Sequence, residues 1–409
     1  MIGTKGGGPM DIRRNMLVQA GKDSCYNVSL LFVSGTMVQL FLAHKGVTSA
    51  QIGVFSSVLQ IVSMAVMVLL SDVAERFTCM QKACSKLLLI QAVLYLLYLP
   101  VAAVSTLGSK AVFWCVMLIS SIQTVFVALR SIWEYKLLYE IAPVRESGTL
   151  MSFGGIGVGI VGMVSGWLFS ALIEKSPTDR TYLICMAIGS AALFLAAFFC
   201  RQLKVISQVF TVVQNKQNHF SEIKAVLLGP DFRNYIIPNA MRGITNGVFV
   251  SITLIAMASG LSAGNVARLS VMSSLGFILG STLYYFLTKR CRASTIGILG
   301  SILLCACFFM SLGGPNWFLG VYMVSYVGKV LMDYAVVVVV MENIEPTTSG
   351  IYNTWRIVIF TLISAATVLV IGMIVEQIDP LWFLIPCGLC YLISMLWYAI
   401  GFGKKNAQA

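Results

Sequence analysis

The sequence predicts an all-α polytopic membrane protein, with twelve transmembrane helices in two pseudo-symmetric six-helix bundles. Composition is the first observation: 58% of the 409 residues are hydrophobic and 11% are charged, whereas soluble domains have about 25% charged residues. Because so little polar surface cannot cover this chain in water, we expect lipid to be its solvent. The apolar runs lack the alternation of barrel strands, so helices are the expected spanning elements.

The number and spacing of the apolar runs are the second observation, since a helix needs about 20 residues to cross a bilayer. The runs cover residues 14–43, 52–71, 86–105, 111–137, 150–173, 181–200, 233–259, 266–287, 294–312, 317–341, 355–375 and 381–402. The longest polar connection follows the sixth run and is basic. We therefore expect an N-terminal bundle over 1–200, a cytoplasmic linker over 201–232 and a C-terminal bundle over 233–409.

Charged residues within the apolar runs provide the third observation, because they occur in matching pairs. The pairs are Lys22 with Arg242, Arg130 with Lys329, and Glu134 with Asp333. A charge at the bilayer centre costs roughly 2.5–3.5 kcal/mol, so such residues usually face a polar cavity. Their recurrence in order, at drifting offsets, indicates an internal duplication built around one central site.

Basic residues in the connections indicate the orientation. Few of them lie on the side away from the termini, namely Lys45, Lys110, Lys175, Arg180 and Arg268. The positive-inside rule then places both termini in the cytoplasm, in what we expect to be a bacterial inner membrane. The net charge of +12 is explained by this topology, so no nucleic-acid partner is expected.

The residues that usually carry enzyme chemistry are sparse or lie in apolar runs. The only two histidines fall in connections, and most of the eleven cysteines lie in membrane runs, including Cys387 and Cys390. No metal cluster, nucleophile constellation or phosphate loop is recognised in the sequence. We therefore expect no enzyme and no cofactor. The expected partners are a small-molecule solute and the lipid bilayer, and we expect a monomer.

The connection after the second run carries a motif, Leu70-Ser71-Asp72-Val73-Ala74-Glu75-Arg76. Together with the twelve runs and the duplication, it resembles the major facilitator superfamily, whose corresponding loop reads roughly Gly-x-Leu-x-Asp-x-x-Gly-Arg. Leu70, Asp72 and Arg76 match this pattern, while Val68 and Glu75 replace its glycines. The resemblance implies that Asp72 and Arg76 form a cytoplasmic gating latch, and that helices one, four, seven and ten line a central cavity.

Polar stripes at helical spacing on those four helices suggest the site residues. The candidate substrate-binding residues are Lys22, Tyr26, Gln123, Arg130, Arg242, Asn246, Tyr322, Lys329 and Arg356. The candidate proton carriers are Asp23, Glu134 and Asp333, because protonation of a membrane carboxylate depends on its solvation and on nearby cations. The (i, i+4) pairs on the fourth and tenth runs either neutralise themselves or compete with solute, and the spacing leaves both readings open.

Cations on the first and seventh helices resemble the anion clamp of organophosphate–phosphate antiporters. The predicted function is a secondary active transporter that moves a small anionic solute by alternating access, coupled to protons or to exchange. Two alternatives stay open: a proton antiporter that exports drugs or other amphipathic compounds, and a non-transporting membrane sensor of the same fold.

Glycines of the fifth run, including Gly155 and Gly162, predict close helix packing.

Overall fold

The computed structural model describes most of the chain, and the described part is almost entirely helical. The described residues are 3–4, 9–75, 79–104, 108–142, 144–175, 177–208, 230–310, 317–343, 349–378, 382 and 384–406. Two short strands, β1 (Gly3–Thr4) and β2 (Ser207–Gln208), pair antiparallel. The structure therefore confirms the predicted all-α class.

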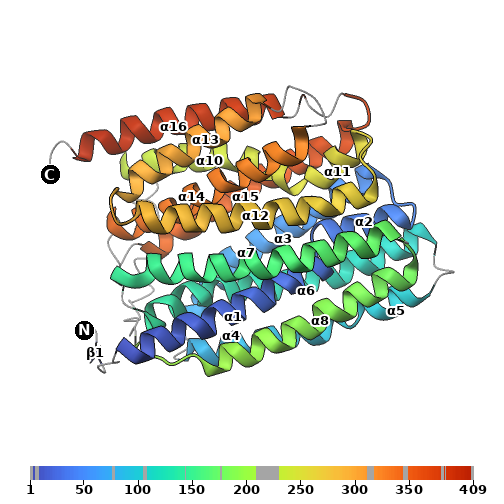
Figure 1. The fold of residues 1–409 in the computed structure, drawn as a ribbon, viewed down its shortest axis with the longest axis horizontal. Helices are drawn as coiled ribbons and strands as arrows, with labels where there is room; N and C mark the ends of the chain where they lie inside the picture. Colours follow the sequence, from blue (N-terminus) through green and yellow to red (C-terminus); the bar gives the residue numbers. More distant parts are fainter. Residues whose placement is uncertain are drawn as a thin grey trace.

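The helices fall into two groups that are consecutive in the sequence. In Figure 1 the first group is coloured from blue to green and the second from yellow to red. The first contains α1 (Pro9–Val33), α2 (Thr36–His44), α3 (Ser49–Glu75), α4 (Met80–Tyr95), α5 (Tyr98–Ala103), α6 (Ser109–Ile141), α7 (Val144–Lys175) and α8 (Asp179–Gln202). The second contains α10 (Pro230–Val250), α11 (Ile252–Ala258), α12 (Ala263–Leu287), α13 (Ala293–Met310), α14 (Phe318–Asn343), α15 (Ser349–Ile374) and α16 (Leu384–Asn406).

Each predicted apolar run coincides with one helix or with one broken pair of helices. Among the described residues, eight helices are long and apolar enough to cross a membrane, and the bent pair α10 and α11 makes a ninth. The first run breaks between α1 and α2 at Gly35, whose φ of 53° suits a residue without a side chain. The seventh run bends by 51° between α10 and α11, so the two matching runs are interrupted at matching places.

Helix neighbours in the first group recur in the second. Helix α1 packs on α7 and α8, and α10 packs on α15 and α16. Likewise, α3 and α4 both pack on α6, while α12 and α13 both pack on α14. The groups meet along α3 with α15 and along α7 with α12. This repeated packing agrees with a duplicated six-helix unit; residues 209–229 of the predicted linker lie outside the described residues.

Exposed tryptophans mark one end of the bundle. Trp114, Trp167, Trp317 and Trp382 are 62% to 67% exposed. They lie toward the ends of α6, α7, α14 and α16 that are away from both chain termini, which share the opposite end of the molecule (Figure 1). Exposed tryptophans are enriched where a membrane meets water. This end, which we call the far end, therefore carries one membrane boundary.

Candidate functional site

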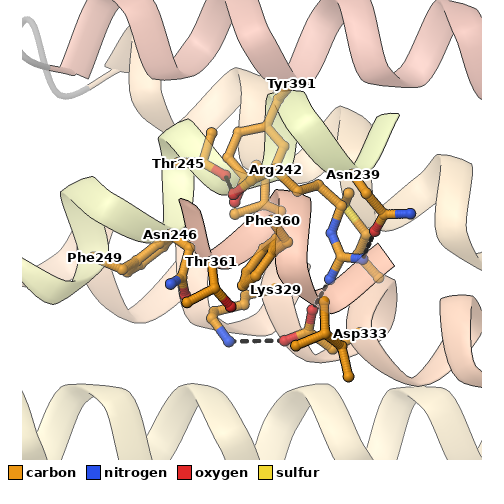
Figure 2. A pocket seen from close by; sticks show the side chains of 13 residues that line it. Asn239, Arg242, Thr245, Asn246, Phe249, Lys329, Asp333, Phe360, Thr361 and Tyr391 are labelled. Atoms are coloured by element: carbon orange, nitrogen blue, oxygen red, sulfur yellow. Dashed lines mark hydrogen bonds and ion pairs between the residues drawn. The ribbon is translucent and has the colours of Figure 1, made fainter. Parts of the chain in front are cut away.

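A cavity of about 340 Å³ lies in the second group of helices (Figure 2). Its walls come from α10, α13, α14, α15 and α16. The polar lining residues are Asn239, Arg242, Thr245, Asn246, Lys329, Asp333, Thr361 and Tyr391, and the apolar ones are Phe249, Leu304, Met332, Ile357 and Phe360. Polar residues thus outnumber apolar ones in this lining, whereas the walls of most small-molecule sites are mainly apolar. The cavity therefore suits a polar or charged solute.

One carboxylate joins the two cations of this cavity. Lys329 Nζ donates to Asp333 Oδ2 at 2.7 Å, and the Arg242 guanidinium donates to Asp333 Oδ1. Arg242 also donates to Asn239 Oδ1 at 3.3 Å. Two positive charges facing one negative charge leave the described lining with one positive charge in excess. The cavity therefore attracts anions.

A second charged cluster is buried between α1 and α6, in the first group of helices. Lys22 Nζ lies 2.8 Å from Glu134 Oε1 and 3.1 Å from Asp23 Oδ1. Arg130 Nη1 lies 3.1 Å from the same Glu134 oxygen, and its guanidinium carbon lies 3.7 Å from the centre of the Tyr26 ring. Lys22 is 1% exposed and Arg130 is 3% exposed. Each buried cation thus contacts a carboxylate, as burial requires.

The two clusters share one bonding pattern. Glu134 on α6 binds Arg130, one turn earlier on the same helix, and Lys22 on α1. Asp333 on α14 likewise binds Lys329, one turn earlier, and Arg242 on α10. This agreement between halves supports the duplication independently of the sequence offsets.

One position explains why only the second cluster has excess charge. Asp23 follows Lys22, whereas Gly243 follows Arg242. A Cβ atom at Gly243 would lie 2.7 Å from the carbonyl oxygen of Phe360, so close packing of α10 on α15 leaves no room for an aspartate there. The first cluster therefore balances two cations with two carboxylates, whereas Asp333 is the one carboxylate among the described residues of the second.

The halves contact each other closely at the far end. Arg268 forms a bidentate ion pair with Glu174 at 3.1 Å, and Thr253 Oγ1 donates to Thr36 Oγ1 at 3.1 Å. Gly53 and Gly372 meet so closely that a Cβ atom on Gly53 would lie 2.8 Å from the Gly372 Cα atom. These contacts join α7 to α12, α2 to α11 and α3 to α15. The structure is thus a state closed at the far end.

Glycines of α7 make the close helix contacts that the sequence predicts. A Cβ atom at Gly162 would lie 2.6 Å from Ser274 Oγ, and one at Gly166 would lie 3.1 Å from the Val271 nitrogen, both on α12. Gly155 lies against Ser281 and Tyr334. The small residues therefore let the two halves approach backbone to backbone.

Three solved structures share this arrangement over nearly the whole chain. A D-xylose-proton symporter matches with a TM-score of 0.71 at 11% identity, covering 94% of this chain and 96% of its own. The E. coli fucose:proton symporter FucP gives 0.66 at 13% identity, covering 95% and 99%. The nucleoside transporter NupG gives 0.65 at 15% identity, covering 95% and 99%. FucP is a major facilitator superfamily transporter.

The chain has the major facilitator fold. The predicted fold class, including its resemblance to that superfamily, is thereby confirmed. No family model matches the sequence, and no curated protein matches it either. At these low identities the likeness establishes the fold, and the solute must be argued from the site.

The major facilitator fold brings most of the predicted site residues into the two clusters, but it places Gln123 and Tyr322 elsewhere. Gln123 donates to the carbonyl oxygen of Gln91 at 2.9 Å, and so holds α6 against α4. Tyr322 packs against Phe249 and Tyr326, next to the cavity rather than in its lining. Asn246 lines the cavity and donates to Ser364 Oγ at 2.9 Å.

Three predicted residues cannot be placed in the site. Arg356 lies on α15 and Asp72 on α3, but their side chains are outside the described residues, as is all of Arg76. Their assignment to solute binding and to a gating latch of the major facilitator fold stays a prediction.

Several lining residues are absent from the sequence-based prediction. Phe360 and Thr361 lie on α15, and Tyr391 lies on α16. The first two were within reach of sequence reasoning, because Phe360 follows Arg356 by one helical turn and shares its face. For Tyr391, the only indication in the sequence is that it is a phenol within an apolar run.

Proposed function

We propose that the chain is a secondary active transporter of the major facilitator superfamily, and that it carries a small anionic solute by alternating access. The observation that carries the proposal is the excess positive charge of the cavity, where Arg242 and Lys329 share Asp333. A solute anion can occupy the donors of both cations. The transporters of the same fold, two of them named as proton symporters, support the transport part.

Proton coupling follows from the competition at Asp333. When Asp333 is ionised, it binds both cations, and the three groups together have a net charge of +1. Protonation removes that negative charge, so the net charge of the three groups rises to +2 and the donors become available to an anion. A proton and an anion therefore favour each other's binding, which is the thermodynamic condition for symport.

The first cluster has a different role in this proposal. Lys22, Arg130 and Tyr26 contact one another or the carboxylates Asp23 and Glu134, so the cluster is internally neutral. It holds α1 to α6 and offers its groups to solute or proton only when the two helices separate. Solute recognition thus belongs mainly to the second half, over 233–409.

The proposed location is the cytoplasmic membrane, with both termini and the linker over 201–232 inside. The observation that supports it is the scarcity of basic residues in the connections at the far end. In this orientation the far end faces outward, so the state closed at that end is closed toward the outside.

A neutral polar solute is the second candidate. The observation that favours it is that both cations already bind Asp333, while amides and hydroxyls such as Asn239, Asn246 and Thr361 complete the lining. Such groups suit a sugar, which is the solute named for two of the structural relatives.

The test is a thermal-stability screen of the detergent-purified protein against anionic, neutral and cationic metabolites and drugs. A ligand that binds only the folded state stabilises it by about 2.7 kcal/mol at 100 times its dissociation constant. We expect anions to raise the melting temperature of the wild-type protein, and not that of Arg242→Gln. The matched control is Arg268→Gln, which removes an arginine far from the cavity and should keep the response.

Three results would contradict the anion assignment. Stabilisation by sugars that persists in Arg242→Gln would favour the neutral candidate. Stabilisation by lipophilic cations that persists in the same variant would favour export of amphipathic compounds. Absence of stabilisation by every class would favour the sensor alternative.

A further inference from the structure

We infer that the solute is an aromatic acid, in which a flat ring accompanies the anionic group. The inference rests on the proposed function and adds the chemistry of the solute's body. It comes from the aromatic side chains that line the same cavity as Arg242 and Lys329, namely Phe249 and Phe360.

The charged and aromatic parts of the cavity are separated along α10. Arg242 and Phe249 are seven residues apart, which is about two turns or roughly 10 Å along the helix. Figure 2 shows Phe249 toward one side of the cavity and Arg242 with Asp333 toward the other, with Phe360 between them. A solute that places its acidic group on the cations must therefore extend its body past Phe360 toward Phe249.

Phe360 lies directly beside the anion-binding cations. Its ring centre is 5.8 Å from the guanidinium carbon of Arg242. A planar acid bound at Arg242 thus has an aromatic neighbour for the part of the molecule next to its carboxylate. Offset or edge-on contact between aromatic groups stabilises beyond the burial of their area.

The Phe249 ring is held in place by two tyrosines of α14. Its centre lies 5.9 Å from those of Tyr322 and Tyr326, and the two tyrosine rings are 5.5 Å apart. Because neighbours on α14 fix this ring, binding a solute ring against it costs little conformational freedom. A pre-positioned aromatic wall favours a flat, unsaturated body over a puckered, saturated one.

The first charged cluster uses its aromatic contact differently. Its aromatic residue, Tyr26, has Arg130 stacked on it at 3.7 Å. That ring face is occupied by a cation of the protein itself. The cavity volume of about 340 Å³ is near the lower end of ligand pockets, roughly 300–1,000 Å³, and suits a single-ring acid.

The test compares matched acids by isothermal titration calorimetry on the purified full-length protein. The probes are phenylacetate and cyclohexylacetate, which share charge and skeleton, with 2-phenylethanol as the uncharged ring. We expect phenylacetate to bind roughly 2- to 10-fold more tightly than cyclohexylacetate, from the contribution of aromatic pairs. Replacement of both rings in Phe249→Leu/Phe360→Leu should abolish this ratio, whereas Phe249→Tyr/Phe360→Tyr, which keeps both rings, should retain it.

The control variant is Phe286→Leu, because Phe286 is 59% exposed on α12 and outside the cavity lining. It should keep the wild-type ratio. Equal affinities for the two acids in the wild-type protein would overturn the inference. So would a preference that survives in Phe249→Leu/Phe360→Leu, or the absence of binding by both acids at millimolar concentration.

Failure of the inference can be separated from failure of the proposed function. If the two acids bind equally and both are lost in Arg242→Gln, the anion proposal stands and the ring selectivity falls. If 2-phenylethanol binds as tightly as phenylacetate and Arg242→Gln binds both, the solute is an uncharged aromatic compound. That result would overturn both the anion assignment and the aromatic acid.

Discussion

Glu134 is the residue on which the first charged cluster depends. It accepts from both Lys22 and Arg130, and these two cations lie on different helices. The (i, i+4) spacing with Arg130 was visible in the sequence, because helical periodicity is local. The bond to Lys22 was not, since it depends on how α1 and α6 are rotated against each other.

Replacement of Glu134 tests whether this cluster is structural. Glu134→Gln leaves two buried cations with Asp23 alone, and breaking a buried ion pair in this way costs about 3–5 kcal/mol. The double variant Arg130→Gln/Glu134→Gln restores the balance of one cation and one carboxylate. We therefore expect the double variant to melt at a higher temperature than Glu134→Gln. Additive losses would show that the two charges are not coupled.

Asp333 provides the corresponding test in the second cluster. Asp333→Asn removes the carboxylate that competes with solute for Arg242 and Lys329. If the solute is an anion, the affinity of this variant for it should rise by tenfold or more. A tenfold rise requires that competition from Asp333 costs the wild-type protein about 1.4 kcal/mol of binding free energy. Titration of wild-type and variant protein with the anion identified by the thermal screen measures this change. An unchanged or lower affinity would contradict competition at Asp333.

Among the elements, α3 and α15 bring the backbones of the two halves into direct contact. Gly53 and Gly372 lie at this crossing, and Ser57 Oγ donates to the Ala365 carbonyl oxygen at 2.9 Å. The sequence predicted both helices from their apolar runs. It did not predict the crossing, because the two glycines are far apart in the chain and neither belongs to a recognisable pattern within its own apolar run.

Addition of one methyl group measures how much this crossing matters. A Cβ atom at Gly372 would lie 2.7 Å from the Gly53 Cα atom, so Gly372→Ala should destabilise the closed state, by about 1–3 kcal/mol as for overpacking. The control is Gly320→Ala on α14, where a Cβ atom meets nothing within 4 Å. The melting temperature should fall for the first variant and stay level or rise slightly for the second. Equal melting temperatures would mean that the helices separate at no cost.

At the scale of the whole molecule, the ion pair of Glu174 with Arg268 closes the far end across the two halves. Both side chains are exposed, at 56% and 46%, and such pairs contribute roughly 0.2–1 kcal/mol. This is small against the stability of the fold, but it can change the ratio of two conformations by up to about fivefold. The pair therefore acts on the equilibrium between states.

Labelling of a cysteine buried between the halves at the far end tests whether the Glu174–Arg268 pair holds that end closed. Thr253 is buried between the halves at the far end. Thr253→Cys should react slowly with a membrane-impermeant maleimide, and faster when combined with Arg268→Gln. The swapped pair Glu174→Arg/Arg268→Glu should return the rate to that of Thr253→Cys alone. The background is the parent protein without the added cysteine. If the labelling rate of Thr253→Cys is unchanged by Arg268→Gln, the Glu174–Arg268 pair does not hold the far end closed.

The same labelling reports the orientation. Reagent added to intact cells reaches Thr253→Cys only if the far end faces outward, as the distribution of basic residues predicts. Labelling only after the cells are opened would reverse the proposed topology.

The sequence alone determined the class of this protein, the positions of its spans and the duplication of its charges. These follow from hydropathy and from helical period, which are properties of neighbouring residues. They were sufficient to select the four helices that carry Lys22, Arg130, Arg242 and Lys329.

Only the tertiary structure decided which carboxylate pairs with which cations, and that two cations share one carboxylate in the cavity. The excess charge in the second half arises because Gly243, packed on α15, takes the place that Asp23 holds in the first half. Likewise, Phe360 and Tyr391 join the cavity through the packing of α15 and α16 on α10. Contacts between helices depend on their rotation and separation, and no local pattern along one chain segment specifies these.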